Sequence, residues 1–292
     1  MQNYRKGIIL AGGKATRLYP LTLSISKQLI PVYNKPMIYY PLTTLMLSGI
    51  RDILLISTEK DIKNFKDLLG DGNLWGINIQ YAIQKKPEGI AQSLLIAENF
   101  LSGAPCALIL GDNLFYGNSL TRIFQKANNN LSGATLFAYP VNNPERFGVV
   151  KFDNKFNVLD IAEKPQITKS NYAITGLYFY DENAVDYAKS LTPSKRGELE
   201  ITDLNNIYLK NNNLKVEVFG RGIAWLDTGT FDSLHEASSL VRTLEHSQNL
   251  KIGYPEEISW RMGWIDDKEL ETLALKHEAN DYGRYLLGLI KS

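Results

Sequence analysis

The sequence has little of what disulfide-linked, membrane-spanning or polyanion-binding proteins need. Its 292 residues include one cysteine, Cys106, which excludes an intrachain disulfide and suits a reducing cytoplasm. No apolar run approaches the roughly 18 residues of a membrane helix, and MQNYRKG at the start lacks the apolar stretch of a signal peptide. Lys and Arg total 32 against 31 Asp and Glu, so charge gives no reason to expect nucleic acid or a membrane as partner. We therefore expect a cytoplasmic protein that binds anions through local clusters of charge.

The first part of the chain alternates between short apolar runs and helical segments. The runs, at 7–11, 53–57, 79–84 and 107–110, read as buried strands. Helices are expected between them, one starting at Pro36 and stopping at Gly49, one capped by Thr58 over 59–69, and one over 90–101. This alternation predicts a parallel sheet with right-handed crossovers, in which ligands bind beyond the carboxyl ends of the strands.

The pattern changes after residue 113. A helix over 119–130 and a strand over 134–141 precede a strand-rich stretch from 147 to 181. Helices are expected at 182–191 and 203–210, short strands at 215–219 and 224–226, and a helix capped by Thr230 to about 247. Residues 250–292 read as mostly helical. We predict an α/β fold with a mixed, mostly parallel, Rossmann-like sheet, a smaller β-rich part and C-terminal helices. The predicted division is a core at 1–250, with halves at about 1–135 and 136–250, and a helical segment at 251–292.

A glycine pair ends the first strand. Gly12 and Gly13 let the backbone approach a ligand closely, and Arg17 and Lys27 follow at short distance. Backbone N–H groups and two cations at a strand end indicate a phosphate-binding loop.

Two common phosphate loops do not fit this stretch. A Walker loop needs G-x-x-x-x-G-K-[ST], but Ala15 follows Lys14 and Ile8 stands at the first glycine position. The third glycine of the dinucleotide motif G-x-G-x-x-G is also missing, which disfavours a Rossmann-type dehydrogenase.

Three polar side chains follow other apolar runs. Asp112 and Asp227 come at or just past strand ends, where carboxylates can hold Mg²⁺ that bridges phosphates, although each alone could be a turn residue. The amide of Gln84 offers an acceptor and a donor that complement the N3–H and carbonyl edge of thymine or uracil. Cytosine or adenine would mispair there, at roughly 1–3 kcal/mol for each unsatisfied group.

These stretches carry a family resemblance. L-A-G-G-x-x-T-R-L with S-K-Q-L-x-P resembles the signature of the sugar-phosphate nucleotidylyltransferases. The likeness is strongest to the short-form glucose-1-phosphate thymidylyltransferases and extends over nearly the whole chain, in SKQLIPVYNKPMIYYPL, LLGDGNLWGINIQYAIQ, LILGDNLFYG, NNPERFGVV, SNYAITGLYFYD, RGELEITDLNNIYL and AWLDTGT. One departure is Ala15, where the family usually has glycine, which predicts a slightly stiffer loop tip.

The resemblance implies an activity and its partners. Such enzymes form dTDP-glucose and pyrophosphate from dTTP and glucose 1-phosphate, in the pathway to dTDP-rhamnose and related sugars. They use Mg²⁺, usually form homotetramers and show product feedback, here expected from dTDP-rhamnose.

The resemblance also implies roles for individual residues. The expected catalytic residues are Arg17, Lys27, Asp112, Lys164 and Asp227. Asp112 and Asp227 are the expected metal ligands. The expected nucleotide-binding residues are Leu10, Gly12, Gly13, Thr16, Arg17, Lys27, Gln84, Gly89 and Asp112. The expected sugar-phosphate-binding residues are Asn113, Gly148, Glu163, Lys164, Tyr178 and Arg196.

Two alternatives remain open at this point. The same chemistry could use UTP or another sugar, because Gln84 alone does not separate thymine from uracil. A non-catalytic sugar-nucleotide sensor is a different class, disfavoured because Arg17, Lys27, Asp112 and Asp227 are all present.

Overall fold

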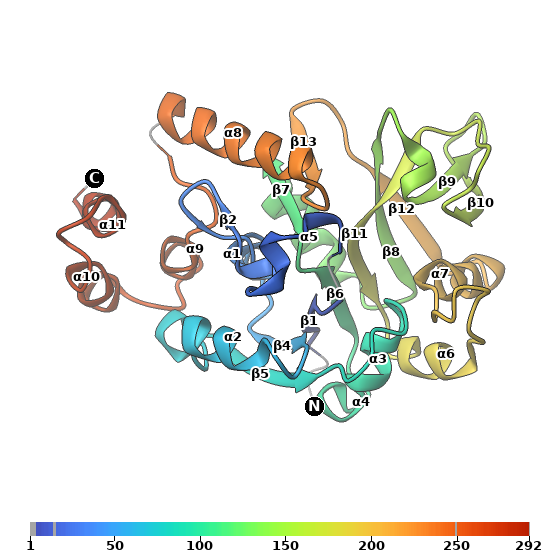
Figure 1. Ribbon diagram of the computed structural model, residues 1–292, viewed down its shortest axis with the longest axis horizontal. Helices are drawn as coiled ribbons and strands as arrows, with labels where there is room; N and C mark the ends of the chain where they lie inside the picture. Colours follow the sequence, from blue (N-terminus) through green and yellow to red (C-terminus); the bar gives the residue numbers. More distant parts are fainter. Residues whose placement is uncertain (1–3, 14–15, 249, 292) are drawn as a thin grey trace.

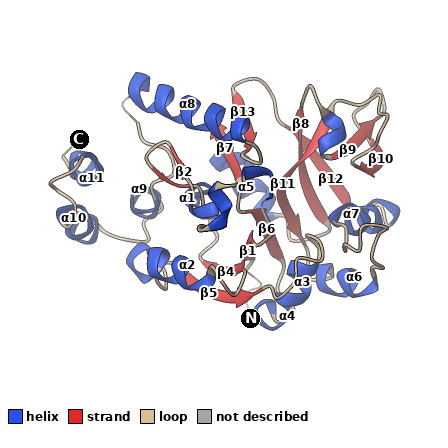
Figure 2. Cartoon of the chain, viewed as in Figure 1, coloured by secondary structure: helices blue, strands red, loops and turns tan. Residues whose placement is uncertain are grey.

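The computed structural model of this protein describes residues 4–13, 16–248 and 250–291. Lys14 and Ala15, and with them the expectation of a stiff loop tip, lie outside these residues. One mixed sheet runs through the centre of the molecule, with helices on both of its faces (Figures 1 and 2).

The N-terminal half of the sheet is parallel, as predicted. Four strands lie in the order β6-β1-β4-β5, and all three pairings are parallel. Their bounds are β1 Lys6–Ala11, β4 Asp52–Ser57, β5 Asn78–Ile83 and β6 Cys106–Leu110. The carboxyl ends of β1, β4, β5 and β6 therefore share one edge, where the predicted nucleotide-binding residues follow the strands.

The direction of the sheet reverses at β11 (Tyr172–Tyr180), which runs antiparallel to β6. Beyond β11, the sheet contains β8 Ala134–Pro140, β9 Gly148–Phe152, β10 Val158–Glu163 and β12 Leu214–Val218. The predicted fold class, mixed and Rossmann-like, is confirmed. Ligands of such sheets bind where the strand order or direction changes, and this change lies between the two halves.

The helices of the first half are shorter than predicted. They are α1 Tyr39–Leu47, α2 Ile62–Leu69, α3 Gln92–Ile96 and α4 Glu98–Leu101. The expectation that Pro36 starts a helix is wrong, because Pro36 pairs with Pro31 in a short hairpin of β2 (Pro31–Val32) and β3 (Lys35–Pro36). Thr58 forms a turn with Asp61, whose N–H lies 3.2 Å from the Thr58 hydroxyl, and α2 begins after that turn.

The remaining helices follow the predicted positions. They are α5 Leu120–Asn129, α6 Ala184–Ser190, α7 Ile201–Lys210, α8 Phe231–Gln248, α9 Pro255–Arg261, α10 Asp267–Leu275 and α11 Asp281–Ile290. Thr230 precedes α8 and accepts a hydrogen bond from the Ser233 N–H at 3.2 Å, as a cap should. Helices α9 to α11 lie at one end of the molecule (Figure 1). Single 3-10 turns lie at Thr16–Leu18, Leu21–Leu23, Lys27–Leu29, Asn73–Trp75 and Pro144–Arg146. The predicted division of the chain at residue 250 stays a prediction.

Two strands that carry the site form a separate pair. β7 (Asn113–Gly117) was not predicted as a strand, and it pairs antiparallel with β13 (Ile223–Asp227). In this pairing Asp227 lies opposite Asn113.

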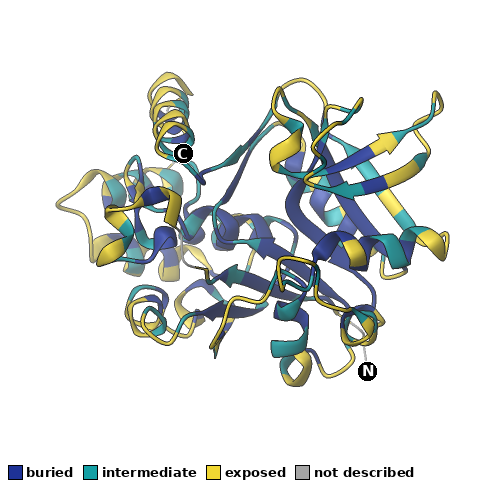
Figure 3. Ribbon diagram, turned by 45° about the vertical axis from the view of Figure 1, so that its right-hand side comes forward, coloured by how far each residue is buried: buried dark blue, intermediate teal, exposed yellow. Residues whose placement is uncertain are grey.

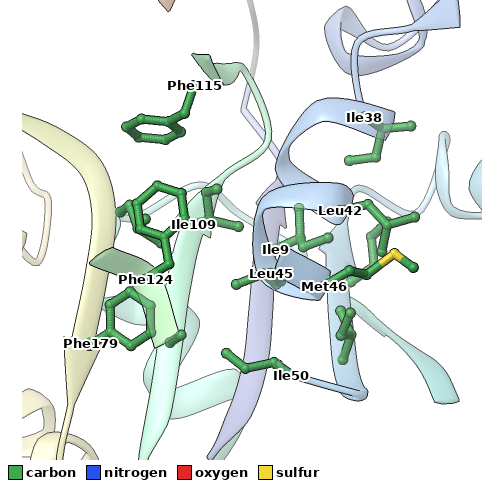
Figure 4. Packing of buried hydrophobic residues seen from close by; sticks show 14 of the residues in the cluster. Ile9, Ile38, Leu42, Leu45, Met46, Ile50, Ile109, Phe115, Phe124 and Phe179 are labelled. Atoms are coloured by element: carbon green, nitrogen blue, oxygen red, sulfur yellow. The ribbon is translucent and has the colours of Figure 1, made fainter. Parts of the chain in front are cut away.

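The core has a layer on each face of the sheet. Neighbouring strand residues point to opposite faces, so Ile9 packs with Leu42, Leu45 and Phe124, while Ile8 packs in the other layer with Leu94 and Leu204. Figure 4 shows the first layer between β1, α1 and the phenylalanines, and Figure 3 shows the buried strands inside an exposed outer surface. No helix of the described chain is long and apolar enough to span a membrane.

Candidate active site

A cavity of about 410 Å³ lies between the two halves of the sheet. Eight residues predicted for the site line it: Arg17, Asp112, Asn113, Gly148, Glu163, Lys164, Tyr178 and Asp227. They come from segments far apart in the sequence, near the ends of β6, β10 and β13 and along β11. Among these eight residues the cavity walls therefore combine three acids, Asp112, Glu163 and Asp227, with the two cations Arg17 and Lys164.

Asp112 forms a close, mostly buried ion pair with Lys27. Burial raises the pKa of the Asp112 carboxyl, but the Lys27 ammonium and hydrogen bonds from Lys27 and Asn113 outweigh it and hold that pKa below its ordinary value. Asp227 behaves in the opposite way. Burial and the charge of Asp112 raise the pKa of Asp227 to about 6, against the pull of Lys27, Arg17 and Arg146.

Asn113 fixes the position of Asp112. Its Nδ2 donates to Asp112 Oδ1 at 2.9 Å, and its Oδ1 accepts from Gly176 N at 3.0 Å and Trp225 Nε1 at 2.6 Å. A Cβ on residue 176 would lie 2.7 Å from Asn113 Oδ1, so glycine is needed there. Asn113, predicted to bind the sugar phosphate, thus also ties β7 to β11 and β13.

The acid pair fits a hard divalent cation. Two carboxylates that repel each other, as the raised pKa of Asp227 indicates, gain from a shared positive charge. In the described chain no group of three or more His, Cys, Asp or Glu side chains could hold a metal. A metal at Asp112 and Asp227 would therefore take further oxygens from phosphates and water, which is how Mg²⁺ usually binds.

Arg17, which follows the glycine pair in the sequence, lies near Asp227. Gly13 has a φ of +106°, a backbone conformation that favours glycine. A Cβ on Gly229 would lie 2.9 Å from Arg17 Nη2 and 3.0 Å from Asp227 Oδ1. Arg17 Nη2 and Asp227 Oδ1 therefore both lie next to Gly229, and the Arg17 charge stays close to the Asp227 carboxylate.

The other predicted nucleotide-binding residues are not among those that line the cavity, and Leu10, Gly12 and Gln84 lie at or just past the ends of β1 and β5. Leu10 accepts from Gly111 N at 2.9 Å, and Thr16 begins the 3-10 turn that contains Arg17. Gln84 covers Gly12 so closely that a Cβ there would lie 2.1 Å from Gln84 Oε1. Gly89, with a φ of +104°, packs on the backbone of Leu199.

The predicted sugar side is organised around Glu163. Its Oε2 accepts from the Thr202 hydroxyl at 2.6 Å, and its Oε1 lies 3.5 Å from Lys164 Nζ and 3.2 Å from Arg196 Nη2. Arg196 does not line the cavity and is held by Glu200 at 2.7 Å and 3.1 Å. Lys164, with a φ of +41°, occupies a backbone region that costs free energy for a side chain other than glycine.

Sequence reasoning missed several residues of the cavity. Arg146, Thr202 and Trp225 line it, and the charge of Arg146 lowers the pKa of Asp227. Arg146 lies in NNPERFGVV, one of the stretches that carry the family resemblance. A cation directly before Phe147 and Gly148 was the signal by which the sequence could have identified it as a site residue. The hydrogen bond that makes Thr202 important depends on folding and has no local signature.

The chain matches the model of the family described as "Nucleotidyl transferase" over residues 6–243. It is 58% identical over 286 residues to glucose-1-phosphate thymidylyltransferase of Neisseria meningitidis, covering 98% of this chain and 99% of the relative. It is 54% identical over 286 residues to the enzyme of the same name in Mycobacterium tuberculosis, with the same coverage.

Solved structures show the same fold. A Bacillus anthracis protein, provisionally assigned as a glucose-1-phosphate thymidylyltransferase and crystallised with sucrose, matches with a TM-score of 0.76 at 39% identity, over 86% of this chain and 98% of that one. A UDP-glucose pyrophosphorylase bound to UDP-glucose matches with a TM-score of 0.73 at 22% identity, over 82% and 99%. The second likeness bears on the fold alone.

Proposed function

The chain belongs to the nucleotidyl transferase family and is an enzyme of the glucose-1-phosphate thymidylyltransferase type, and we propose that it makes dTDP-glucose and pyrophosphate from dTTP and glucose 1-phosphate. The observation that carries this proposal is the single cavity that holds the acids Asp112 and Asp227 together with the cations Arg17 and Lys164. Such a cavity suits two polyanionic substrates and a divalent cation.

The reaction is an in-line displacement. A phosphate oxygen of glucose 1-phosphate attacks the α-phosphorus of dTTP, the bond from that phosphorus to the bridging oxygen breaks, and pyrophosphate leaves with the electron pair. The attacking oxygen is already anionic, so no general base is required. The protein's task is to hold the two anions in line and to neutralise the charge that develops.

Each charged residue has a place in this scheme. Lys164 holds the attacking phosphate, Lys27 contacts the α-phosphate, and Arg17 binds the β- and γ-phosphates and stabilises the leaving pyrophosphate. Mg²⁺, held by Asp112 and Asp227, would supply positive charge to the phosphate oxygens. Glu163 accepts from sugar hydroxyls. Arg196, whose guanidinium is bonded to Glu200 and Glu163 outside the cavity wall, would be a second anchor for the sugar phosphate only after leaving these partners.

The remaining nucleotide-binding residues surround the base and the phosphates. Gln84 reads the edge of thymine, and Leu10, Gly12, Gly13, Thr16 and Gly89 form the surrounding loop walls. Gly148, Tyr178 and Asn113 line the sugar pocket on the other side.

Several further properties are proposed from the family resemblance. The enzyme would act in the cytoplasm on the path to dTDP-rhamnose, as a homotetramer inhibited by dTDP-rhamnose. Light scattering tests the tetramer, and initial rates with added dTDP-rhamnose test the feedback. Loss of inhibition on altering residues 250–292 would assign that segment a regulatory role.

The proposed function is tested by pyrophosphate release with glucose 1-phosphate, Mg²⁺ and each of dTTP, UTP, CTP, ATP and GTP in turn. Fastest release with dTTP supports the thymidylyl assignment. Faster release with another nucleotide would keep the chemistry but overturn the base assignment. If no nucleotide supports release in folded protein, the proposed function is replaced by a non-catalytic sugar-nucleotide sensor or by an enzyme for a different sugar phosphate.

A further inference from the structure

A chain of hydrogen bonds links Gln84 to the loop that precedes α3. Gln84 Nε2 donates to Gln92 Oε1 at 2.7 Å. The same Gln92 Oε1 accepts from the backbone N–H of Glu88 at 3.2 Å, and Gln92 Nε2 donates to Glu88 Oε2 at 2.7 Å. Gln84 is 4% exposed, so its amide has little freedom to find partners in solvent.

These bonds determine which way the amide of Gln92 points. A backbone N–H can only donate and an ionised carboxylate can only accept. The atom of Gln92 that faces Glu88 N must therefore be its oxygen, and the atom that faces the Glu88 carboxylate must be its nitrogen. Reversing the Gln92 amide would set donor against donor and acceptor against acceptor, so this orientation follows from the network.

The orientation of Gln92 then determines that of Gln84. Because Gln92 presents an oxygen, Gln84 must turn its NH₂ group toward it. Gln84 Oε1 consequently lies against Gly12, and within the described ranges no donor is paired with it. Among the residues that the structure describes, Gln84 therefore keeps one unpaired acceptor, Oε1, and one N–H on Nε2 that Gln92 does not use.

We propose that Gln92 is a positioning residue that sets base specificity by preventing the Gln84 amide from flipping. This inference rests on the proposed function, in which Gln84 reads the base. A glutamine free to flip could pair equally well with either pyrimidine type. It would accept from N3–H and donate to O4 of thymine or uracil, or after a flip donate to N3 and accept from N4–H of cytosine. Held by Gln92, it suits only thymine and uracil.

The test compares dUTP with dCTP, because these nucleotides differ only in the base edge that Gln84 would read. The ratio of their kcat/KM values is measured with glucose 1-phosphate and Mg²⁺ in the wild type and in Gln92→Met. We expect the wild type to prefer dUTP on the order of 100-fold. Gln92→Met should reduce this preference at least about tenfold, while the KM for glucose 1-phosphate stays unchanged. Calorimetric binding of the two nucleotides gives a second readout that does not require turnover.

Two matched variants separate orientation from general damage. Gln92→Glu still presents oxygens to Gln84 and should keep the preference within about threefold, although it repels Glu88. Glu88→Gln leaves the backbone N–H of residue 88 in place, so this variant should also retain the preference for dUTP. Gln92→Ala replaces Gln92→Met if the latter fails to fold by circular dichroism.

The outcomes distinguish this inference from the proposed function. A preference unchanged in folded Gln92→Met, or reduced equally in Gln92→Glu, overturns the positioning role. A wild type that turns over no nucleotide with glucose 1-phosphate overturns the proposed function, while the calorimetric ratio still decides the role of Gln92. A wild type that binds dUTP and dCTP equally contradicts the positioning role.

Discussion

Asp227 lies opposite Asn113 in the β7–β13 ladder, and Asn113 in turn donates to Asp112 at 2.9 Å. This pairing holds the two carboxylates close enough that the charge of Asp112 adds to burial, and together they raise the pKa of Asp227 to about 6. The repulsion between the two carboxylates lowers the free energy of unfolding of the metal-free protein. The same repulsion favours binding of a cation between them.

Removing the charge of Asp227 should stabilise the metal-free protein. The pKa of Asp227 is raised from 3.8 to about 6, so the folded protein disfavours the ionised carboxylate. The resulting loss in the free energy of unfolding grows as the pH rises above 3.8 and is complete above about pH 6. Asp227→Asn should therefore raise the free energy of unfolding at pH 8 by about 1–3 kcal/mol, and by less at pH 5. Urea unfolding at both pH values measures this. Exposed Asp160→Asn is the control, and an equal effect of Asp227→Asn at both pH values would contradict the charge argument.

Arg17 should matter for the chemical step. Its guanidinium and the Asp227 carboxylate both lie next to Gly229, where the leaving pyrophosphate would gather charge. Arg17→Ala should lower kcat by roughly 100- to 1000-fold, as losing one donor to developing charge does elsewhere, with a smaller change in KM for glucose 1-phosphate. Exposed Arg122→Ala should change neither constant. Equal kcat at saturation for Arg17→Ala and wild type would show that Arg17 has no role in the chemical step.

Gly12 should be required by the nucleotide and not by the sugar. A Cβ at residue 12 would lie 2.1 Å from Gln84 Oε1 and displace the amide from the base. Gly12→Ala should raise the KM for dTTP about tenfold or more, in line with one lost base contact, and leave the KM for glucose 1-phosphate unchanged. Gly220, with no atom within 4 Å of an added Cβ, gives the matched control Gly220→Ala. If the KM values for dTTP and glucose 1-phosphate rise together, the damage is general, and the assignment of Gly12 to the nucleotide side of the site is wrong.

Asn113 should contribute to stability as well as to the site. Asn113→Ala would leave the Gly176 N–H and the Trp225 Nε1–H buried without an acceptor. Each such loss costs about 1–3 kcal/mol, so the urea midpoint should fall clearly. Asn99→Ala on the exposed side of α4 should change stability by less than about 0.5 kcal/mol. A midpoint equal to that of the control would show that water replaces the Asn113 carbonyl.

The parallel half of the fold could be predicted from the sequence because its signals are local. Each buried strand is a short apolar run, and its end is marked by a polar residue or glycine, as at Gly12, Gln84 and Asp112. The topology then requires these ends to share one edge of the sheet. Boundaries were less predictable where a neighbour overrides propensity, as at Pro36, which pairs with Pro31 in a hairpin.

The remaining features depend on partners distant in the sequence. β7 exists because β13 pairs with it, and nothing in Asn113-Leu114-Phe115-Tyr116-Gly117 reveals that partner. The position of Arg196 depends on Glu200 and Glu163, which hold its guanidinium outside the cavity wall. The contact of Gln92 with Gln84 likewise appears only when the loop before α3 folds back on the end of β5.

The central claim is a direct transfer of the thymidylyl group from dTTP to glucose 1-phosphate. Exchange of labelled pyrophosphate into dTTP, measured with Mg²⁺ in the presence and absence of glucose 1-phosphate, tests it most directly. A direct displacement predicts exchange only when glucose 1-phosphate is present, because the reverse reaction needs dTDP-glucose. Exchange without the sugar phosphate would contradict the account by showing a nucleotidyl-enzyme intermediate, and no exchange with it would contradict the thymidylyl transfer itself.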